Sequence, residues 1–372
     1  MRTLSKSLSA AALLFFSACS DDATTGGAGG AGAAAGAPSQ GGSSAGGSSA
    51  GGTANAGGAG ASSVGGDAQG GALQGGASSG GAAPMGGSGG GGPTVEDPGL
   101  MTSDARIYTT DGTEYVIDEV GDAFSHAAAT ASDNLVFYVH GRGCGGNGEP
   151  DKSLGDSMPA MEADYSARVI MFNWQGSDVG CPLGFPEDEA RAAGPAFAHT
   201  LEKLAYYRVT HPGALTGLKV TLITHSMGSL VLESATGSGP LPTGLFDTVV
   251  LNAAASARAG HAAWVALVPL SAALYVTEND DDNILTAASV LGGVRLGKNV
   301  DGEPLASNAA YVDFTASSVN HAYYVHGGQD GAHMTAFYDA VMNGLPFDFA
   351  QAAGIASVES RDGTAIYSFD GN

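Results

Sequence analysis

From about residue 135 onward, short apolar runs alternate with longer amphipathic stretches. The apolar runs are continuous and rich in β-branched and aromatic residues, which predicts strands that are covered on both faces, as in a parallel sheet. The predicted strands are residues 135–139, 169–172, 220–223, 248–251, 273–276 and 311–314. Apolar residues spaced at three and four predict the intervening helices, at residues 187–208, 226–235, 259–267, 284–291 and 334–342.

Two predicted hairpins stand outside this alternation. Asp111-Gly112 separates two short β-rich segments, which we expect to form antiparallel strands at the start of the sheet. Asp362-Gly363 separates a second pair near the C-terminus. The alternation of strands and helices elsewhere predicts an α/β fold with a doubly wound, mostly parallel sheet.

The N-terminal quarter of the chain differs sharply in composition. About 29 of the 60 glycines lie between Ala23 and Pro93, among residues that are mostly Ala and Ser. Such a tract cannot bury enough apolar surface to offset the entropy lost on ordering. We therefore expect residues 19–94 to be a disordered tether and residues 95–372 to form one folded domain.

The first eighteen residues have the features of an export signal. Arg2 and Lys6 precede a short apolar run, which is too short to span a bilayer as a helix. Phe16, two small residues and Cys19 then resemble the lipobox of bacterial lipoproteins, in which the cysteine becomes lipidated. The resemblance implies a signal peptide over residues 1–18 and a lipid anchor at Cys19. It places the protein in the bacterial cell envelope, on the periplasmic or the cell-surface face. An ordinary secretory signal peptide is the alternative.

Charge excludes one class of partner. The formal net charge is −23, and the predicted folded part carries about 34 acidic against about 12 basic residues. A body this acidic repels phosphate backbones, so we do not expect nucleic acid as a partner.

The strongest chemical signal follows the predicted strand at residues 220–223. That strand leads directly into Ser226, and small residues then begin a predicted helix. In a nucleophile elbow the serine sits on such a tight turn and projects above the sheet. Thr224 stands where the G-x-S-x-G pattern has its first glycine, and Gly228 occupies the second glycine position. A helix N-cap serine is the structural alternative.

Because of this elbow-like segment around Ser226, residues 135–342 resemble the α/β-hydrolase superfamily. They resemble more closely a subfamily of mostly uncharacterised bacterial members. His140-Gly141 ends the first core strand, as the H-G dipeptide does in that superfamily. The resemblance implies an oxyanion hole formed by the backbone N–H groups of Arg142 and Met227. Only about twenty residues separate the strands at 248–251 and 273–276, which leaves no room for a large cap domain.

The acid of a catalytic triad is expected after the strand at residues 273–276, in the chain order serine, acid, histidine. The Thr-Glu-Asn-Asp pattern that ends at Asp280 resembles the corresponding strand end of the subfamily, which favours Asp280 as the partner of the histidine. Asp281 is the next candidate, followed by Asp282 and Glu278. A solvated acidic loop or a weak Ca²⁺ site would explain the same cluster.

The base is expected after the last core strand. His321 fits the histidine-containing segment that the subfamily has at this place, while His333 and His326 are rivals. The chain has no tight ligand spacing such as H-E-x-x-H, so we predict neither a metal nor a cofactor.

Cys144 and Cys181 remain as a pair once Cys19 is assigned to the lipid, and an oxidising compartment favours a disulfide between them. Both follow predicted neighbouring strands and would leave the same edge of the sheet. Two buried free thiols are the alternative.

The resemblance as a whole implies a surface-tethered serine hydrolase that cleaves a small-molecule or lipid carboxylic ester through Ser226, Asp280 and His321. A non-catalytic binding lipoprotein on the same fold and an acyltransferase with the same triad are the alternatives.

Overall fold

The computed structural model describes residues 95–130, 132–143, 150–174, 185–317, 319, 321–325 and 331–371. The predicted signal peptide, Cys19 and the Gly/Ala/Ser tract lie outside these residues. Cys144, Cys181 and His326 also lie outside them. The lipid anchor, the tether and the disulfide therefore stay predictions.

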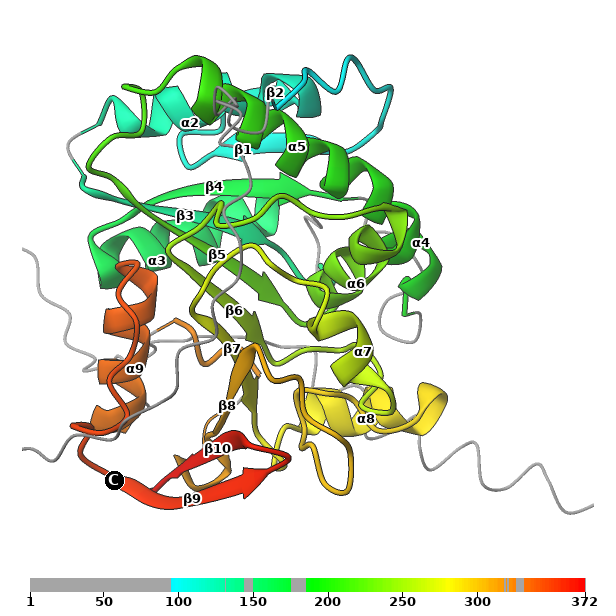
Figure 1. Cartoon of the computed structure of the whole chain (residues 1–372), viewed down its shortest axis with the longest axis vertical. Helices are drawn as coiled ribbons and strands as arrows, with labels where there is room; N and C mark the ends of the chain where they lie inside the picture. The colour runs from blue at the N-terminus through cyan, green and yellow to red at the C-terminus, as the bar shows by residue number, and fades with distance from the viewer. Residues whose placement is uncertain are drawn as a thin grey trace, which may run out of the picture. The chain divides into compact units, whose positions relative to one another are not determined.

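The described residues build one ten-stranded sheet in the order β2-β1-β4-β3-β5-β6-β7-β8-β10-β9 (Figure 1). The strands are β1 Arg106–Thr109, β2 Glu114–Val116, β3 Asn134–Val139, β4 Arg168–Asn173, β5 Lys219–His225, β6 Thr248–Asn252, β7 Leu274–Glu278, β8 Ala309–Asp313, β9 Ile355–Arg361 and β10 Thr364–Phe369. Neighbours from β4 through β10 pair in parallel. The carboxyl ends of β3 to β8 therefore meet at one edge.

Helices cover both faces of this sheet. The α-helices are α2 Val120–Ala128, α3 Met158–Tyr165, α4 Glu187–Ala192, α5 Gly194–Thr210, α6 Gly228–Ser238, α7 His261–Val265, α8 Asn283–Gly292 and α9 Ala332–Met342. Short helical turns lie at Ile117–Glu119, Ser153–Ser157 and Thr315–Ser317. Within the described residues, none of these helices has both the length and the apolar character needed to cross a bilayer.

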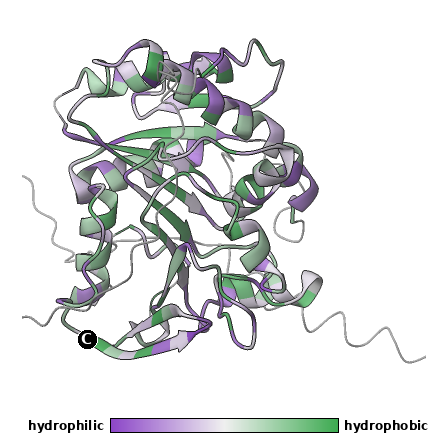
Figure 2. Cartoon of the chain, in the orientation of Figure 1, coloured by the Kyte–Doolittle hydropathy of each residue, from purple (hydrophilic) through white to green (hydrophobic). Residues whose placement is uncertain are grey.

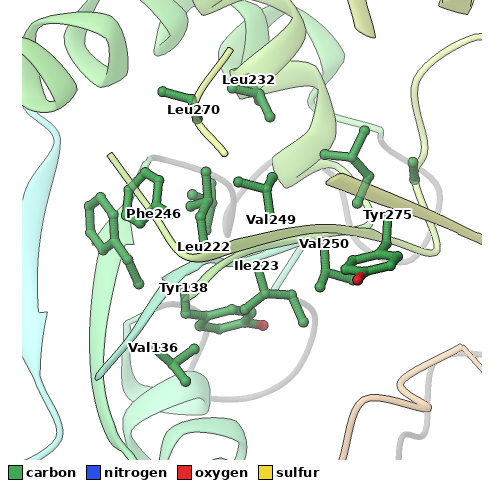
Figure 3. Close-up of a cluster of buried hydrophobic side chains, with 14 of the residues drawn as sticks. Val136, Tyr138, Leu222, Ile223, Leu232, Phe246, Val249, Val250, Leu270 and Tyr275 are labelled. Atoms are coloured by element: carbon green, nitrogen blue, oxygen red, sulfur yellow. The ribbon is translucent and has the colours of Figure 1, made fainter. Parts of the chain in front are cut away.

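Consecutive strand residues show why the apolar runs are continuous. Phe137 packs its ring 5.4 Å from Phe124 of α2 and 6.0 Å from Phe197 of α5. Tyr138 points to the other face, where its hydroxyl lies 2.9 Å from that of Tyr324. Because successive side chains point to opposite faces, a strand covered on both sides is apolar throughout. Figure 3 shows the same division in β5 and β6, and the central strands are largely green, the hydrophobic colour, in Figure 2.

The predicted fold class is confirmed: the sheet is doubly wound and mostly parallel, and the described residues include no large cap domain. Only α7 and its flanking loops lie between β6 and β7. The predicted helix at residues 187–208 is split at Ala193, directly before Gly194-Pro195, into α4 and α5. The first hairpin forms the antiparallel edge β1-β2, and the C-terminal hairpin extends the sheet because β10 pairs with β8.

Candidate active site

Ser226 sits on the turn between β5 and α6 in a backbone conformation that is rare for a residue with a side chain. Its φ is +51°, in the left-handed region. The turn is held from the next strand, because Ser226 N donates to Asn252 O at 2.9 Å and Ala255 N donates to Ser226 O at 3.0 Å. A strained serine at a strand-to-helix turn is the geometry of a nucleophile elbow.

Two glycines allow other backbone segments to approach this turn. A Cβ on Gly228, at the start of α6, would lie 2.4 Å from Val139 O. A Cβ on Gly141 would lie 3.0 Å from the Cβ of Ser226. The loop after β3 therefore packs against Ser226 at Gly141, and Arg142 follows Gly141 in that loop. Met227 follows Ser226, is buried and is the N-cap residue of α6. Both expected oxyanion donors thus belong to segments that adjoin Ser226.

His321 and Asp282 form a buried pair beside the elbow. Nδ1 of His321 lies 2.7 Å from Oδ2 of Asp282, and the two side chains are 6% and 0% exposed. The His321 ring lies 4.8 Å from that of His225, the residue before the serine. The structure therefore places the predicted histidine and an aspartate against the residue that precedes the predicted serine.

That aspartate is not the predicted one. The expectation that Asp280 is the partner of His321 is wrong, because the side chain of Asp280 points to solvent and is 56% exposed. Its Oδ1 instead accepts a hydrogen bond from Asn299 at 2.7 Å and lies 3.4 Å from Nζ of Lys298. The chain turns inward two residues later, where Asp282 begins α8 as its N-cap residue.

The surroundings of Asp282 favour its charged form. Burial by itself would raise the pKa of this carboxyl group, but the net pKa lies below the usual value. The opposing causes are the neighbouring His321 imidazole with its hydrogen bond, and the backbone N–H groups of Leu285 and Ile284. The oxygens of an anionic Asp282 can only accept hydrogen bonds, so Oδ2 accepts the hydrogen bond that Nδ1–H of His321 donates.

Tyr323 and Tyr324, two and three residues after His321, anchor its segment to separate strands. The hydroxyl of Tyr323 lies 2.9 Å from Oγ1 of Thr277 in β7. Tyr324 reaches Tyr138 of β3 through its hydroxyl, and its carbonyl accepts a hydrogen bond from Tyr165 at 2.5 Å. The segment that carries the imidazole is therefore fixed to strands on both sides of β5 and β6.

His225 packs against both His321 and Tyr324. It is buried, its Nε2 lies 3.4 Å from His321 O, and its ring is 4.8 Å from that of Tyr324. Burial, with a smaller effect of His321, lowers the pKa of His225 well below the usual value. His225 is therefore neutral at physiological pH and adds no positive charge beside His321.

The rival residues have other partners. His333 lies at the start of α9, stacks on Phe369 and has its Nε2 3.3 Å from Oδ1 of Asp370. Glu278 ends β7 as a buried residue, and burial with the neighbouring Asp313 raises its pKa to about 8. Asp281 is exposed and donates its N–H to Oδ1 of Asn279 at 3.0 Å.

Among the described residues, no group of three or more His, Cys, Asp or Glu side chains is placed so that it could hold a metal ion.

Comparison with known proteins gives similar structures but no family. No protein-family model and no curated protein matches the sequence. The chain is similar to carboxyl esterase 2 from Tuber melanosporum, at 12% identity over 56% of this chain and 76% of the other, with a TM-score of 0.31. It is also similar to the poly(3-hydroxybutyrate) depolymerase LpqC from Bordetella parapertussis, at 15% identity over 60% and 83% of the two chains, with a TM-score of 0.32. It is similar as well to an esterase from Pyrobaculum calidifontis, at 10% identity over 61% of this chain and 90% of the other, with a TM-score of 0.28.

Proposed function

We propose that this protein is a serine hydrolase that cleaves carboxylic esters with Ser226 as nucleophile, His321 as general base and Asp282 as the acid of the triad. The observation that carries this proposal is the strained serine on the β5-α6 turn beside a buried His321-Asp282 pair. The three residues also follow the chain order serine, acid, histidine of α/β-hydrolase sites.

The pair determines which nitrogen of the imidazole acts. With Nδ1–H donating to Oδ2 of Asp282 at 2.7 Å, the neutral ring keeps a lone pair on Nε2. Nε2 removes the proton of the Ser226 hydroxyl as its oxygen attacks the acyl carbon, and Asp282 stabilises the imidazolium that forms. The imidazolium then protonates the departing alkoxide.

The negative charge on the acyl oxygen requires two N–H donors about 2.7–3.1 Å away. We assign them to the backbone of Arg142 and Met227, because both adjoin Ser226. A water molecule, activated by His321, then hydrolyses the acyl-enzyme and releases the acid. This mechanism uses no metal and no cofactor.

We also propose that the domain is tethered to a membrane of the cell envelope through a lipid on Cys19. The support is the lipobox-like segment that ends at Cys19 and the Gly/Ala/Ser-rich tract after it. A flexible spacer of about 71 residues has a root-mean-square span of about 45–50 Å, which would hold the domain clear of the bilayer.

A fluorophosphonate probe and a short-chain p-nitrophenyl ester test the proposed chemistry. Ser226→Ala should abolish labelling, and Ser226→Ala and His321→Ala should each lower turnover by about 10⁴- to 10⁶-fold. Ser238→Ala, at the exposed end of α6, and His333→Ala are the matched controls and should keep wild-type labelling. A wild-type protein that neither labels nor hydrolyses the ester would refute the proposal, as would an active Ser226→Ala variant.

A further inference from the structure

Asn279 is a buried amide between the proposed acid and the proposed base. It follows the last residue of β7 and has no exposed surface. Each of its polar groups has a partner. Its N–H donates to Gly297 O at 2.8 Å, and its carbonyl accepts from Asp282 N at 3.1 Å. Its Oδ1 accepts from Asp281 N at 3.0 Å, and its Nδ2 donates to Val319 O at 2.9 Å.

These hydrogen bonds link the two loops of the site. Asp281 and Asp282 belong to the loop that carries the acid, whereas Val319 lies two residues before His321. One side chain therefore shapes the acid loop through its oxygen and holds the histidine loop through its nitrogen. Such a bridge between main-chain groups fixes the separation of the two loops.

Thr277 supplies the second half of this arrangement. Side chains two residues apart on an extended strand point to the same face. Thr277 and Asn279 accordingly hold the chain on either side of His321, Thr277 through the hydroxyl of Tyr323 and Asn279 through Val319 O. The imidazole is thus held from both directions by the end of β7.

We propose that Asn279 is the positioning residue that sets the distance between Asp282 and His321, an inference that rests on the proposed serine hydrolase function. The other oxygen of Asp282 caps α8 through Leu285 N, so the carboxylate cannot follow a displaced imidazole without breaking that bond. Without the amide, the buried Val319 carbonyl loses its donor and the histidine loop is free to shift. Displacements of about 1 Å in such a site lower rates by about 100-fold.

Three variants test this role. Asn279→Ala removes both side-chain bonds, whereas Asn279→Ser keeps an oxygen that can accept from Asp281 N but is too short to reach Val319 O. Asn308→Ala is the matched control. Its Nδ2 also donates to a main-chain carbonyl, that of Val265 at the end of α7, at 3.0 Å, but Asn308 precedes β8 at the opposite edge of the sheet.

We expect kcat for the p-nitrophenyl ester to fall about 10- to 100-fold in both Asn279 variants with little change in KM, and to stay at the wild-type value in Asn308→Ala. The kinetic pKa of the base should also shift, because the Asp282 contact to His321 loosens. A purely structural role would lower the melting temperature of Asn279→Ala and Asn308→Ala alike and leave kcat and the pH profile of the folded fraction unchanged.

Proton NMR provides a readout that needs no substrate. A proton on Nδ1 of a carboxylate-bound histidine resonates far downfield of the amides, and this signal should vanish or shift in Asn279→Ala and persist in Asn308→Ala. An unshifted signal together with an unchanged kcat in folded Asn279 variants would overturn the positioning role. A lost signal in Asn279→Ala, in a protein whose wild type never labels with fluorophosphonate, would leave the positioning role intact and refute the proposed hydrolase.

Discussion

The carboxylate of Asp282 joins the imidazole of His321 to the first turn of helix α8. Its Oδ2 lies 2.7 Å from Nδ1 of His321, and its Oδ1 accepts from Leu285 N at 2.9 Å. An N-cap aspartate satisfies a backbone donor that the helix leaves unpaired, and the helix dipole favours its negative charge. The hydrogen bond that begins α8 therefore also keeps Asp282, the partner of His321, ionised and in place.

Replacing each of the two candidate acids, Asp282 and Asp280, by asparagine should separate their roles. Asp282→Asn keeps the side-chain shape and remains a good N-cap residue, but its amide cannot hold His321 in the same tautomer, so kcat should fall about 10⁴-fold with a small change in stability. Asp280→Asn is the control and should keep wild-type kcat, because the exposed carboxylate of Asp280 contacts Asn299 and Lys298 rather than His321. Turnover of the p-nitrophenyl ester at pH 8 measures both. Equal losses in the two variants would contradict the assignment.

A pair of glycines in helix α6 tests the close approach at the elbow. Gly228→Ala would place a methyl group 2.4 Å from Val139 O, which should destabilise the fold by about 2–3 kcal/mol or more and lower activity. Gly237→Ala lies in the same helix with no atom within 4 Å of its new Cβ and should instead stabilise the protein by about 0.5–1 kcal/mol. Urea unfolding measures both changes. A neutral Gly228→Ala variant would show that β3 and α6 can separate without harm.

Glu278 gives a pH dependence with a definite sign. Its pKa is raised to about 8 by burial, Asp313 and Asp301, against smaller effects of Val300 N–H and Arg361. Between the ordinary pKa of 4.5 and about 8 the folded state binds the proton and the unfolded state does not, so folding stability should fall as pH rises through this window.

Glu278→Gln should remove that fall. At pH 8 the variant should exceed the wild type in unfolding free energy by on the order of 3–5 kcal/mol, and at pH 4 the two should agree. Urea unfolding at pH 4, 6 and 8 checks this difference. Wild-type and variant curves that stay parallel across the range would mean that Glu278 is ionised in the folded protein.

Cys19→Ser tests the lipid anchor. The variant should move from the membrane fraction to the soluble periplasmic or secreted fraction, because serine cannot carry the thioether-linked lipid. Cell fractionation followed by immunoblotting measures the distribution, and Ser17→Ala serves as a control that keeps the cysteine. An unmutated protein found wholly in the soluble fraction would contradict the prediction.

Cys181→Ser tests the predicted bridge to Cys144. A disulfide that closes a loop of about 38 residues contributes roughly 3–4 kcal/mol in the chain-entropy model, so the melting temperature should fall. Turnover should fall with it, since Cys144 lies in the loop that carries the Arg142 N–H. Thiol titration of the unfolded protein without reductant counts the free thiols. One titratable thiol for each of Cys144 and Cys181 would exclude the bridge.

The fold was largely predictable because its signals are local. Continuous apolar runs predicted β3 to β8. Helix α2 was missed, although its buried residues Val120, Ala123, Phe124 and Ala127 follow helical spacing. Short helices of this kind are stabilised by tertiary packing more than by their own sequence.

The site was predictable only where chemistry follows a strand directly. Ser226 could be chosen from the elbow, whereas His321 was preferred to His333 and His326 only through the resemblance to the histidine-containing segment of the subfamily. The choice among Asp280, Asp281 and Asp282 depends on which carboxylate the turn after β7 directs inward, and that direction is set by contacts distant in sequence, such as Asn279 to Val319. The helix N-cap position of Asp282 was the one local signal that could have distinguished it.

The two tyrosines after His321 have a consequence for how activity is lost. Tyr324 is bonded to β3 and Tyr323 to β7, and β5 and β6, which carry Ser226 and its supporting loop, lie between those strands. The proposed base is therefore attached to the sheet on either side of the proposed nucleophile rather than carried on an independent flap. Partial opening at a sheet edge would leave the triad intact. In a denaturant titration, esterase activity should disappear together with the tryptophan and far-ultraviolet signals of global unfolding, not ahead of them.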